Sequence, residues 1–275
     1  SVPAILSTRR IETRSDRLVT IAVLPMMSCA GRLPIYMMFV SALFPSRLQA
    51  PVLFGIYASG VLLALCCARL LKNTLFKAPQ RDSLHHMKRL RLPSLRKVGI
   101  LMWSRAFMYV RKAGTFILGA SIILWFLNTY PRPEEDTAPT NAAAMEHSYA
   151  GQIGHWMEPV TQVAGFDWKI NSALVGAFAA KEIFVTQMGI LYAVEDGNSA
   201  PAAQQTLNAR LKASYTPLQG ISIMIFCLIA LPCIGTVTVA KREAGTWWFA
   251  LAQFGGLTLL GFATATLIYQ AGLLL

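Results

Sequence analysis

An apolar run that is interrupted in its middle dominates the first part of this chain. The run extends from Val19 to Phe44, and about 20 apolar residues are enough to cross a bilayer. Its centre, PMMSCAGRLPIY at Pro25–Tyr36, nevertheless contains two prolines, a glycine, a cysteine and an arginine. Proline removes a helix donor and glycine loosens the backbone. Broken helices at membrane depth are tolerated where the freed backbone lines a cavity, so the pattern predicts that Cys29 faces a permeation path.

The composition indicates an integral membrane protein. The chain is 55% hydrophobic and 14% charged, with a mean hydropathy of +0.47, whereas a soluble domain carries roughly 25% charged residues. We therefore expect an all-α, polytopic helical bundle of about six membrane segments with interrupted helices. The net charge of +12 comes from basic residues that flank the apolar spans, which fits the positive-inside rule. The lipid bilayer is thus the expected partner, and nucleic acid is not.

Six apolar segments are expected in the membrane: residues 19–44, 52–71, 113–128, 170–192, 217–240 and 247–275. We divide the chain accordingly into five parts. Two of them are basic segments, at 1–18 and 73–112. The others are a first membrane domain at 19–72, a second membrane domain at 113–240 and a terminal membrane helix at 241–275.

The charge of the connecting stretches predicts the orientation. Residues 1–18 and 73–112 are basic and are placed in the cytoplasm; within the latter stretch an amphipathic helix is expected to begin at Leu95 and to lie on the membrane surface up to Tyr109. The stretch 129–168 is acidic and is placed outside.

Two consequences of this count concern the later part of the chain. Residues 193–216 are expected to form a cytoplasmic loop. Six full crossings would also place Lys241–Glu243 outside, which disagrees with the charge rule. A re-entrant first or fourth segment would remove the disagreement.

Two further features mark the second membrane domain. Lys181 and Glu182 stand near the centre of the fourth segment, where ionisable residues are costly and usually functional. They are adjacent and lie about 100° apart on a helix, so either each has its own partner or the helix breaks there. The fifth segment contains LPCIGTVT, in which Pro232 and Cys233 repeat the kind of interruption found around Cys29.

The interrupted stretch PMMSCAGRLPIY resembles the membrane half of the FeoB-type ferrous iron transport protein B family. Further stretches resemble the same family in the same order: STRRIETRSDRLVTI, LPSLRKVGILMWSRAFMYVRKAGTFILGASIILWFL, GFDWKINSALVGAFAAKEIFVTQMGILY and LPCIGTVTVAKREAGTWWFALAQF. One departure is the order Cys29-Ala30-Gly31-Arg32, where the family usually has Cys-Gly-Ala-Arg. The other is that no GxxxxGK[ST] or NKxD pattern occurs.

The resemblance implies a central family domain at 19–72, a second gate domain within 113–240, and the carboxy-terminal portion of a longer transporter or one product of a split gene. It implies Fe²⁺ as the transported ion and a multi-pass location in a bacterial inner membrane. A GTP-binding G domain and a first gate domain would lie on the same or a companion chain, and small cytoplasmic Feo-type proteins would be accessory partners. We expect no GTP site and no enzyme activity here.

Fe²⁺ is a borderline-soft ion that accepts thiolate ligands, and a transport site must also release it. We expect Cys29 and Cys233 to be transient metal ligands and Glu182 to supply the compensating charge. Supporting or path-lining groups are expected at Ser28, Lys181 and Thr236. Arg32 is expected to point away from the metal and to pair with a carboxylate or a helix end.

Two alternatives are left open. The first is a carrier of nucleosides or other small solutes, in which the cysteines only pack. The second is a membrane scaffold or regulatory subunit that docks a cytoplasmic partner on the basic segment and transports nothing.

Overall fold

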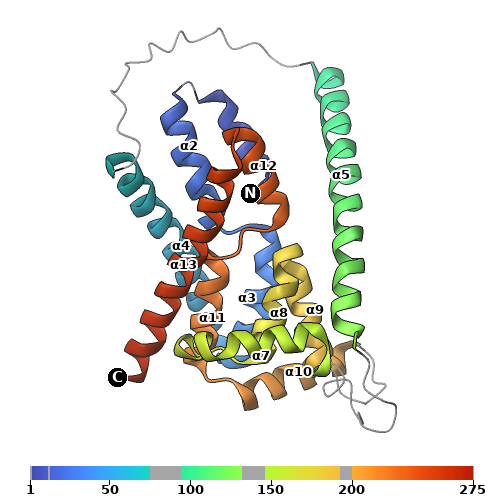
Figure 1. Cartoon of the computed structure of the whole chain (residues 1–275), viewed down its shortest axis with the longest axis vertical. Coiled ribbons are helices and arrows are strands. Elements are labelled where there is room, and N and C mark those ends of the chain that lie inside the picture. The colour runs from blue at the N-terminus through green and yellow to red at the C-terminus, as the bar shows by residue number, and fades with distance from the viewer. Residues whose placement is uncertain (1, 12, 75–93, 132–145, 193–199, 275) are drawn as a thin grey trace.

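The computed structural model of this chain describes residues 2–11, 13–74, 94–131, 146–192 and 200–274 (Figure 1). Within these ranges all regular structure is helical, which confirms the predicted all-α class. The elements are, in order, α1 (Val2–Ser7), η1 (Thr8–Arg10), α2 (Arg14–Val23), η2 (Leu24–Met26), η3 (Ala30–Arg32), α3 (Leu33–Leu43), α4 (Ser46–Thr74), α5 (Leu95–Thr129), α7 (Tyr149–Thr161), η4 (Gln162–Ala164), α8 (Trp168–Ala179), α9 (Lys181–Tyr192), α10 (Ala200–Ser214), α11 (Pro217–Ile229), α12 (Ile234–Ala244) and α13 (Trp247–Leu273).

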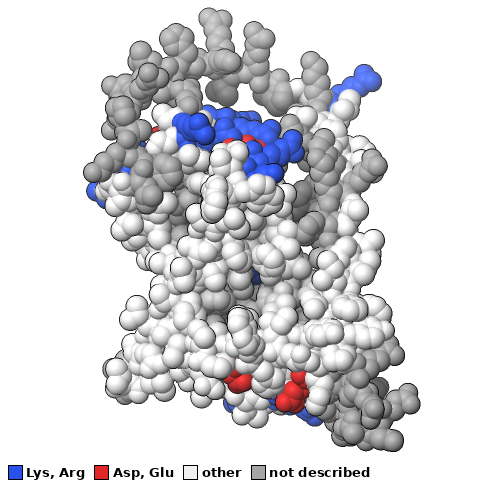
Figure 2. Space-filling model, viewed as in Figure 1, with Lys and Arg blue, Asp and Glu red and all other residues white. Residues whose placement is uncertain are grey.

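A belt whose surface is almost entirely free of charged side chains, called the uncharged belt below, separates two charged ends of the molecule (Figure 2). Lysines and arginines gather at one end, where α2 begins and α12 ends. We call this end, which contains Arg9, Arg17 and Glu243, the basic end. Among the described residues, four helices or interrupted helices are long and apolar enough to cross a membrane: Arg14–Leu43, Ser46–Thr74, Pro217–Ala244 and Trp247–Leu273.

The expected number of about six membrane segments is only roughly supported. The four candidate spans correspond to the first, second, fifth and sixth predicted segments. The third predicted segment lies in α5, a 35-residue helix that stands beside the bundle (Figure 1). The surface helix predicted to end at Tyr109 is the first part of the same continuous helix, so the prediction of a separate element there was wrong.

The fourth predicted segment is a hairpin of two short helices. Both α8 and α9 have 12 residues, which is about 18 Å of helix against about 30 Å of bilayer core. The Tyr192 hydroxyl donates to the Tyr215 hydroxyl at 3.1 Å, and Tyr215 donates to Asp167 Oδ2 at 2.8 Å. Asp167 precedes α8 and Tyr192 ends α9, so the chain enters and leaves this hairpin at the same end of the molecule.

The hairpin removes the topological disagreement noted above. A re-entrant fourth segment places Lys241–Glu243 at the basic end, where Glu243 binds Arg9 and Arg17. The prediction of a cytoplasmic loop at 193–216 was wrong in its secondary structure, because Ala200–Ser214 form the helix α10, at the end opposite the basic end (Figure 1). Residues 193–199, 75–93 and 132–145 lie outside the described ranges, and with them parts of the predicted basic and acidic stretches.

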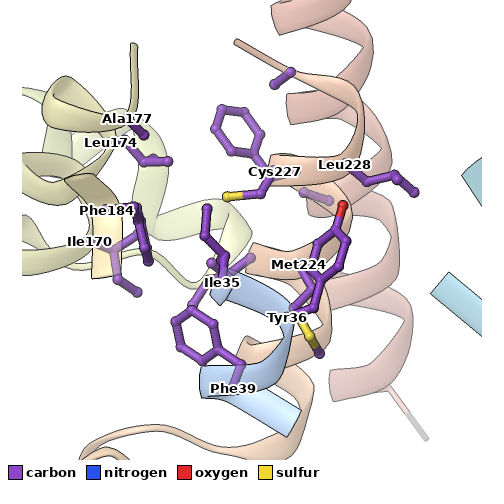
Figure 3. Close-up of a cluster of buried hydrophobic side chains, with 14 of the residues drawn as sticks. Ile35, Tyr36, Phe39, Ile170, Leu174, Ala177, Phe184, Met224, Cys227 and Leu228 are labelled. Atoms are coloured by element: carbon purple, nitrogen blue, oxygen red, sulfur yellow. The ribbon is translucent and has the colours of Figure 1, made fainter. Parts of the chain in front are cut away.

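The core lies where α3 packs against the α8–α9 hairpin and α11 (Figure 3). The α3 residue Phe39 is fully buried, with its ring centroid 6.1 Å from that of Phe184 and 6.3 Å from that of Tyr215. Lipid tails are as apolar as these side chains, so close packing rather than water exclusion holds such helices together. Gly60 shows how close the approach is, because an added Cβ would lie 2.9 Å from Leu228 Cδ1.

Candidate functional site

The first backbone break lies between η2 and η3 and carries Cys29. Pro25 lies within η2 and Pro34 within the first turn of α3. Because proline has no backbone N–H to donate, neither position can continue a helix from the residues before it. Met27 and Cys29 have extended backbones, with φ −72°, ψ 133° and φ −104°, ψ 164°. The break predicted from this stretch is therefore confirmed, and Cys29 occupies the residue that precedes η3.

The second break separates α11 from α12 and carries Cys233. Pro232 disfavours a helical conformation of the residue before it, and Leu231 has φ 53°, in the left-handed region that costs a non-glycine residue about 1–2 kcal/mol. Cys233 is extended, with φ −61° and ψ 154°, and its carbonyl accepts from the first turn of α12. Both cysteines chosen from the sequence thus lie at equivalent positions, immediately before a helical segment.

The third break forms the tip of the α8–α9 hairpin at Ala180, whose backbone is extended with φ −150° and ψ 134°. Neither proline nor glycine occupies this position, so no local breaker signals it. The adjacent charges of Lys181 and Glu182 were the only indication. Of the two possibilities stated for them, a break in the helix is confirmed. Lys181 also has its own hydrogen-bond partners, whereas the Glu182 carboxylate lies close to Gly31.

Lys181 joins the hairpin tip to the second break. Its Nζ donates to the carbonyl oxygens of Cys227 and Ala230, at 3.2 and 3.1 Å. Lys181 is buried, with 5% of its surface exposed. The carbonyls at the end of a helix lack intrahelical partners and carry partial negative charge, so the ammonium group stabilises the terminus that the break creates.

Glu182 joins the hairpin tip to the first break. A Cβ atom added to Gly31 would lie 2.9 Å from Glu182 Oε1, so only glycine allows this carboxylate its present position. Glu182 is exposed within the chain. From the sequence, Gly31 was expected only to loosen the backbone; that it leaves room for Glu182 was not predicted, although its exchange with Ala30 relative to the family order was the available signal.

The other predicted site residues lie at the same breaks. Cys233 Sγ is 3.2 Å from Thr236 Oγ1, and Thr236 is buried. The Ser28 hydroxyl is buried close to the Tyr36 hydroxyl, without hydrogen-bond geometry between them. Lys181 lies within electrostatic range of Cys29, Cys233 and Arg32. The structure therefore gathers the three breaks that carry the predicted residues in one region of the uncharged belt.

Arg32 is a component of this region whose burial the sequence did not predict. It is 2% exposed, and its Nη1 donates to the Met27 carbonyl at 3.3 Å. Met27 directly follows η2, so pairing with a helix end, one of the two partners expected for Arg32, is confirmed. Arg32 and Lys181 bring two positive charges to the breaks, which leaves Glu182 as a needed counter-charge for any cation there.

The region is not a closed metal cage. Within the part of the chain that the structure describes, no group of three or more His, Cys, Asp or Glu side chains could hold a metal ion. What the breaks offer is two thiols, one carboxylate and peptide carbonyls released from helical hydrogen bonding. Such a set suits weak and reversible cation binding rather than permanent coordination.

Comparison with known proteins finds two family models that match parts of the chain. Residues 110–247 match the family model described as Gate, nucleoside recognition, and residues 53–105 match that of the ferrous iron transport protein B C terminus. No solved structure matches the chain.

The curated relatives that match the chain are named as FeoB proteins. The Fe(2+) transporter FeoB of Campylobacter jejuni is 36% identical over 92% of this chain and 41% of its own length. The Fe(2+) transport protein A/Fe(2+) transporter FeoB fusion protein of Porphyromonas gingivalis is 35% identical over the whole chain and 36% of its own length. FeoB of Methanocaldococcus jannaschii is 35% identical over the whole chain and 40% of its own length. The chain thus spans about two fifths of the length of these relatives, and it belongs to the FeoB family, to whose C-terminal membrane portion it corresponds.

Proposed function

We propose that this chain forms part of the Fe²⁺ path of a transporter in a bacterial inner membrane. The carrying observation is the meeting of three helix breaks within the uncharged belt, linked by Lys181 and Glu182. The curated relatives are named as Fe(2+) transporters. Irregular backbone at membrane depth is typical of binding sites in transporters.

The Fe²⁺ path in this proposal passes Cys29, Cys233 and Glu182, which act as separate transient ligands rather than as one coordination group. The two thiols provide ligands that favour a borderline-soft ion over Mg²⁺ or Ca²⁺, and Glu182 offsets part of the positive charge from Arg32 and Lys181. Ser28 and Thr236 contribute hydroxyl oxygens beside the thiols. A small number of ligands completed by carbonyls binds strongly enough to replace water and weakly enough to release the ion.

The orientation and the energy source follow from the same proposal. The basic end faces the cytoplasm by the positive-inside rule, and the ends of the α8–α9 hairpin face outward. The chain passes the membrane several times, and the energy derives from a GTP-dependent G domain elsewhere in the transporter. A first gate domain and small Feo-type accessory proteins complete the assembly.

A second candidate function is the transport of a nucleoside-like solute, which the description of the matching gate model favours. In that case the cysteines pack and bind no ion. The breaks would then present carbonyls and hydroxyls to a neutral polar solute instead of a metal.

Uptake into vesicles that contain the complete transporter tests the proposal. Cys29→Ser and Cys233→Ser should each lower Fe²⁺ uptake strongly with normal insertion. Cys66→Ser, at an exposed cysteine on α4, is the matched control and should behave as wild type. Full Fe²⁺ uptake by the Cys29→Ser/Cys233→Ser double variant would refute the thiol site, and nucleoside uptake unaffected by either change would favour the second candidate.

A further inference from the structure

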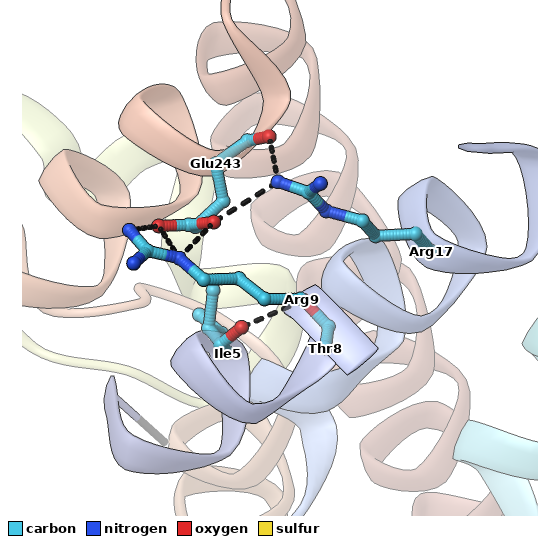
Figure 4. Close-up of polar contacts among 5 residues, drawn as sticks. All are labelled: Ile5, Thr8, Arg9, Arg17 and Glu243. Atoms are coloured by element: carbon cyan, nitrogen blue, oxygen red, sulfur yellow. Dashed lines mark hydrogen bonds and ion pairs between the residues drawn. The ribbon is translucent and has the colours of Figure 1, made fainter. Parts of the chain in front are cut away.

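An ion cluster at the basic end connects segments from opposite ends of the sequence (Figure 4). The Nε of Arg9 donates to both Glu243 carboxylate oxygens at 2.9 Å, and its Nη2 donates to Oε1 at 2.5 Å. The Nη2 of Arg17 donates to Glu243 Oε2 at 3.0 Å and to the Glu243 backbone carbonyl at 2.8 Å. One carboxylate therefore receives two guanidinium groups, one from η1 and one from α2.

This cluster differs from an ordinary surface ion pair, which contributes little to stability. The Glu243 side chain is only 2% exposed, whereas those of Arg9 and Arg17 are 52% and 30% exposed. Forked contacts between guanidinium and carboxylate fix geometry as well as charge. A small apolar cluster of Ile5, Ile21 and Ala240 packs beside them. The contact between the amino-terminal segment and α12 is thus both polar and apolar, and its geometry is well defined.

The helix α12 packs against both α13 and the amino-terminal segment, and its links to the preceding and following helices are not helical. At its start, Leu231 has φ 53°, and at its end Gly245 has φ 84°. The helix has 11 residues, about 16 Å in length. Glu243 lies in its last turn, and Cys233 precedes its first residue. A displacement of the last turn of α12 therefore acts on Cys233 through one continuous helix.

We propose that Glu243 is a positioning residue, through which Arg9 and Arg17 set the location and exposure of Cys233. The elements η1 and α2 are then coupled to the half-helix α12 at the basic end, and a shift of Arg9 or Arg17 there changes the second break. The importance of this coupling for ion passage rests on the proposed function. The coupling itself is a mechanical property of the chain that is measured without transport.

Thiol labelling of the full chain in membrane vesicles tests the coupling. Cys233 is kept as the only cysteine, with serine at the other four positions, and its rate of reaction with N-ethylmaleimide is measured. Glu243→Gln should change that rate several-fold, and Glu243→Asp should restore it in part because it retains the charge. Glu158→Gln removes a carboxylate at the opposite end, beside His155, and should leave the rate as in the parent chain.

A second single-cysteine chain that retains Cys66 separates repositioning from unfolding. Glu243→Gln should leave the Cys66 rate unchanged, since α4 is continuous through this position. An unchanged Cys233 rate in both Glu243→Gln and the Arg9→Gln/Arg17→Gln double variant would overturn the inference, as would an equal rise at Cys66. If serine at Cys233 does not affect Fe²⁺ uptake while labelling still responds to Glu243, the proposed function fails and the coupling stands.

Discussion

Lys181 provides the sharpest test of how the breaks are stabilised. Its ammonium group donates to the carbonyls of Cys227 and Ala230 and is 5% exposed, so water replaces little of this interaction. Lys181→Met retains most of the side-chain volume and removes both hydrogen bonds. The two carbonyls then lose a charged donor at the end of α11.

The expected cost follows from the number of groups left without a partner. A buried carbonyl that loses its donor costs about 1–3 kcal/mol, which gives about 2–6 kcal/mol for two. Deletion of a buried ammonium group also removes its desolvation penalty and its repulsion with Arg32, so we expect a net loss of about 2 kcal/mol. For a chain of this size that corresponds to a fall in Tm of about 4–8 °C.

Thermal unfolding of the purified protein in detergent measures this loss. Lys169→Met is the matched control: the Lys169 Nζ lies 4.7 Å from the Tyr192 ring centroid at the open end of the same hairpin, and the loss of a cation–π contact costs about 0.5–1 kcal/mol. Lys181→Arg retains a cation and should fall between wild type and Lys181→Met. A Tm for Lys181→Met equal to that of wild type would show that the ammonium group does not stabilise the broken helix.

Three further changes probe other contacts. Gly31→Ala should displace the Glu182 carboxylate by about 0.5 Å, from 2.9 Å, and lower Fe²⁺ uptake only slightly at unchanged Tm, because this carboxylate ends a flexible, exposed side chain; a strong loss of uptake would contradict this. Gly235→Ala, where a Cβ meets nothing within 4 Å, should leave uptake unchanged. Gly154→Ala places a Cβ 2.5 Å from the Trp168 carbonyl oxygen and should lower the free energy of unfolding by about 1–3 kcal/mol, because α7 must move away from α8. A thermal unfolding curve equal to that of wild type would contradict this. Burial raises the pKa of the Asp167 carboxyl in the folded protein. The carboxyl therefore stabilises the folded state fully at a pH below its ordinary pKa, and this stabilisation is lost as the pH rises through the raised pKa. Asp167→Asn keeps the helix cap but replaces the oxygen that accepts from the Tyr215 hydroxyl by an amide nitrogen. Its Tm relative to wild type should therefore be more favourable near pH 7 than under acidic conditions, and equal shifts at both would contradict this.

Local sequence signals were sufficient to predict two of the three breaks. Pro25, Pro34 and Pro232 act through the backbone of their own neighbours, because a missing donor and a restricted φ require no tertiary partner. Apolar runs similarly predicted the four candidate spans. The cysteines beside these breaks could be named from sequence for the same reason.

The third break, the hairpin and the closeness of the breaks depended on tertiary structure. Ala180 is a good helix former, and its extended backbone is explained by what flanks it: Lys181 reaches the end of α11, and Glu182 reaches Gly31. A periodic apolar pattern over 170–192 is the same for a straight crossing and for a hairpin, so the sequence alone favoured a crossing. Residue order thus determined which segments are apolar and where prolines interrupt them, whereas long-range electrostatic contacts decided where α8 ends and which helix ends meet, because the partners of those charges are supplied by distant segments.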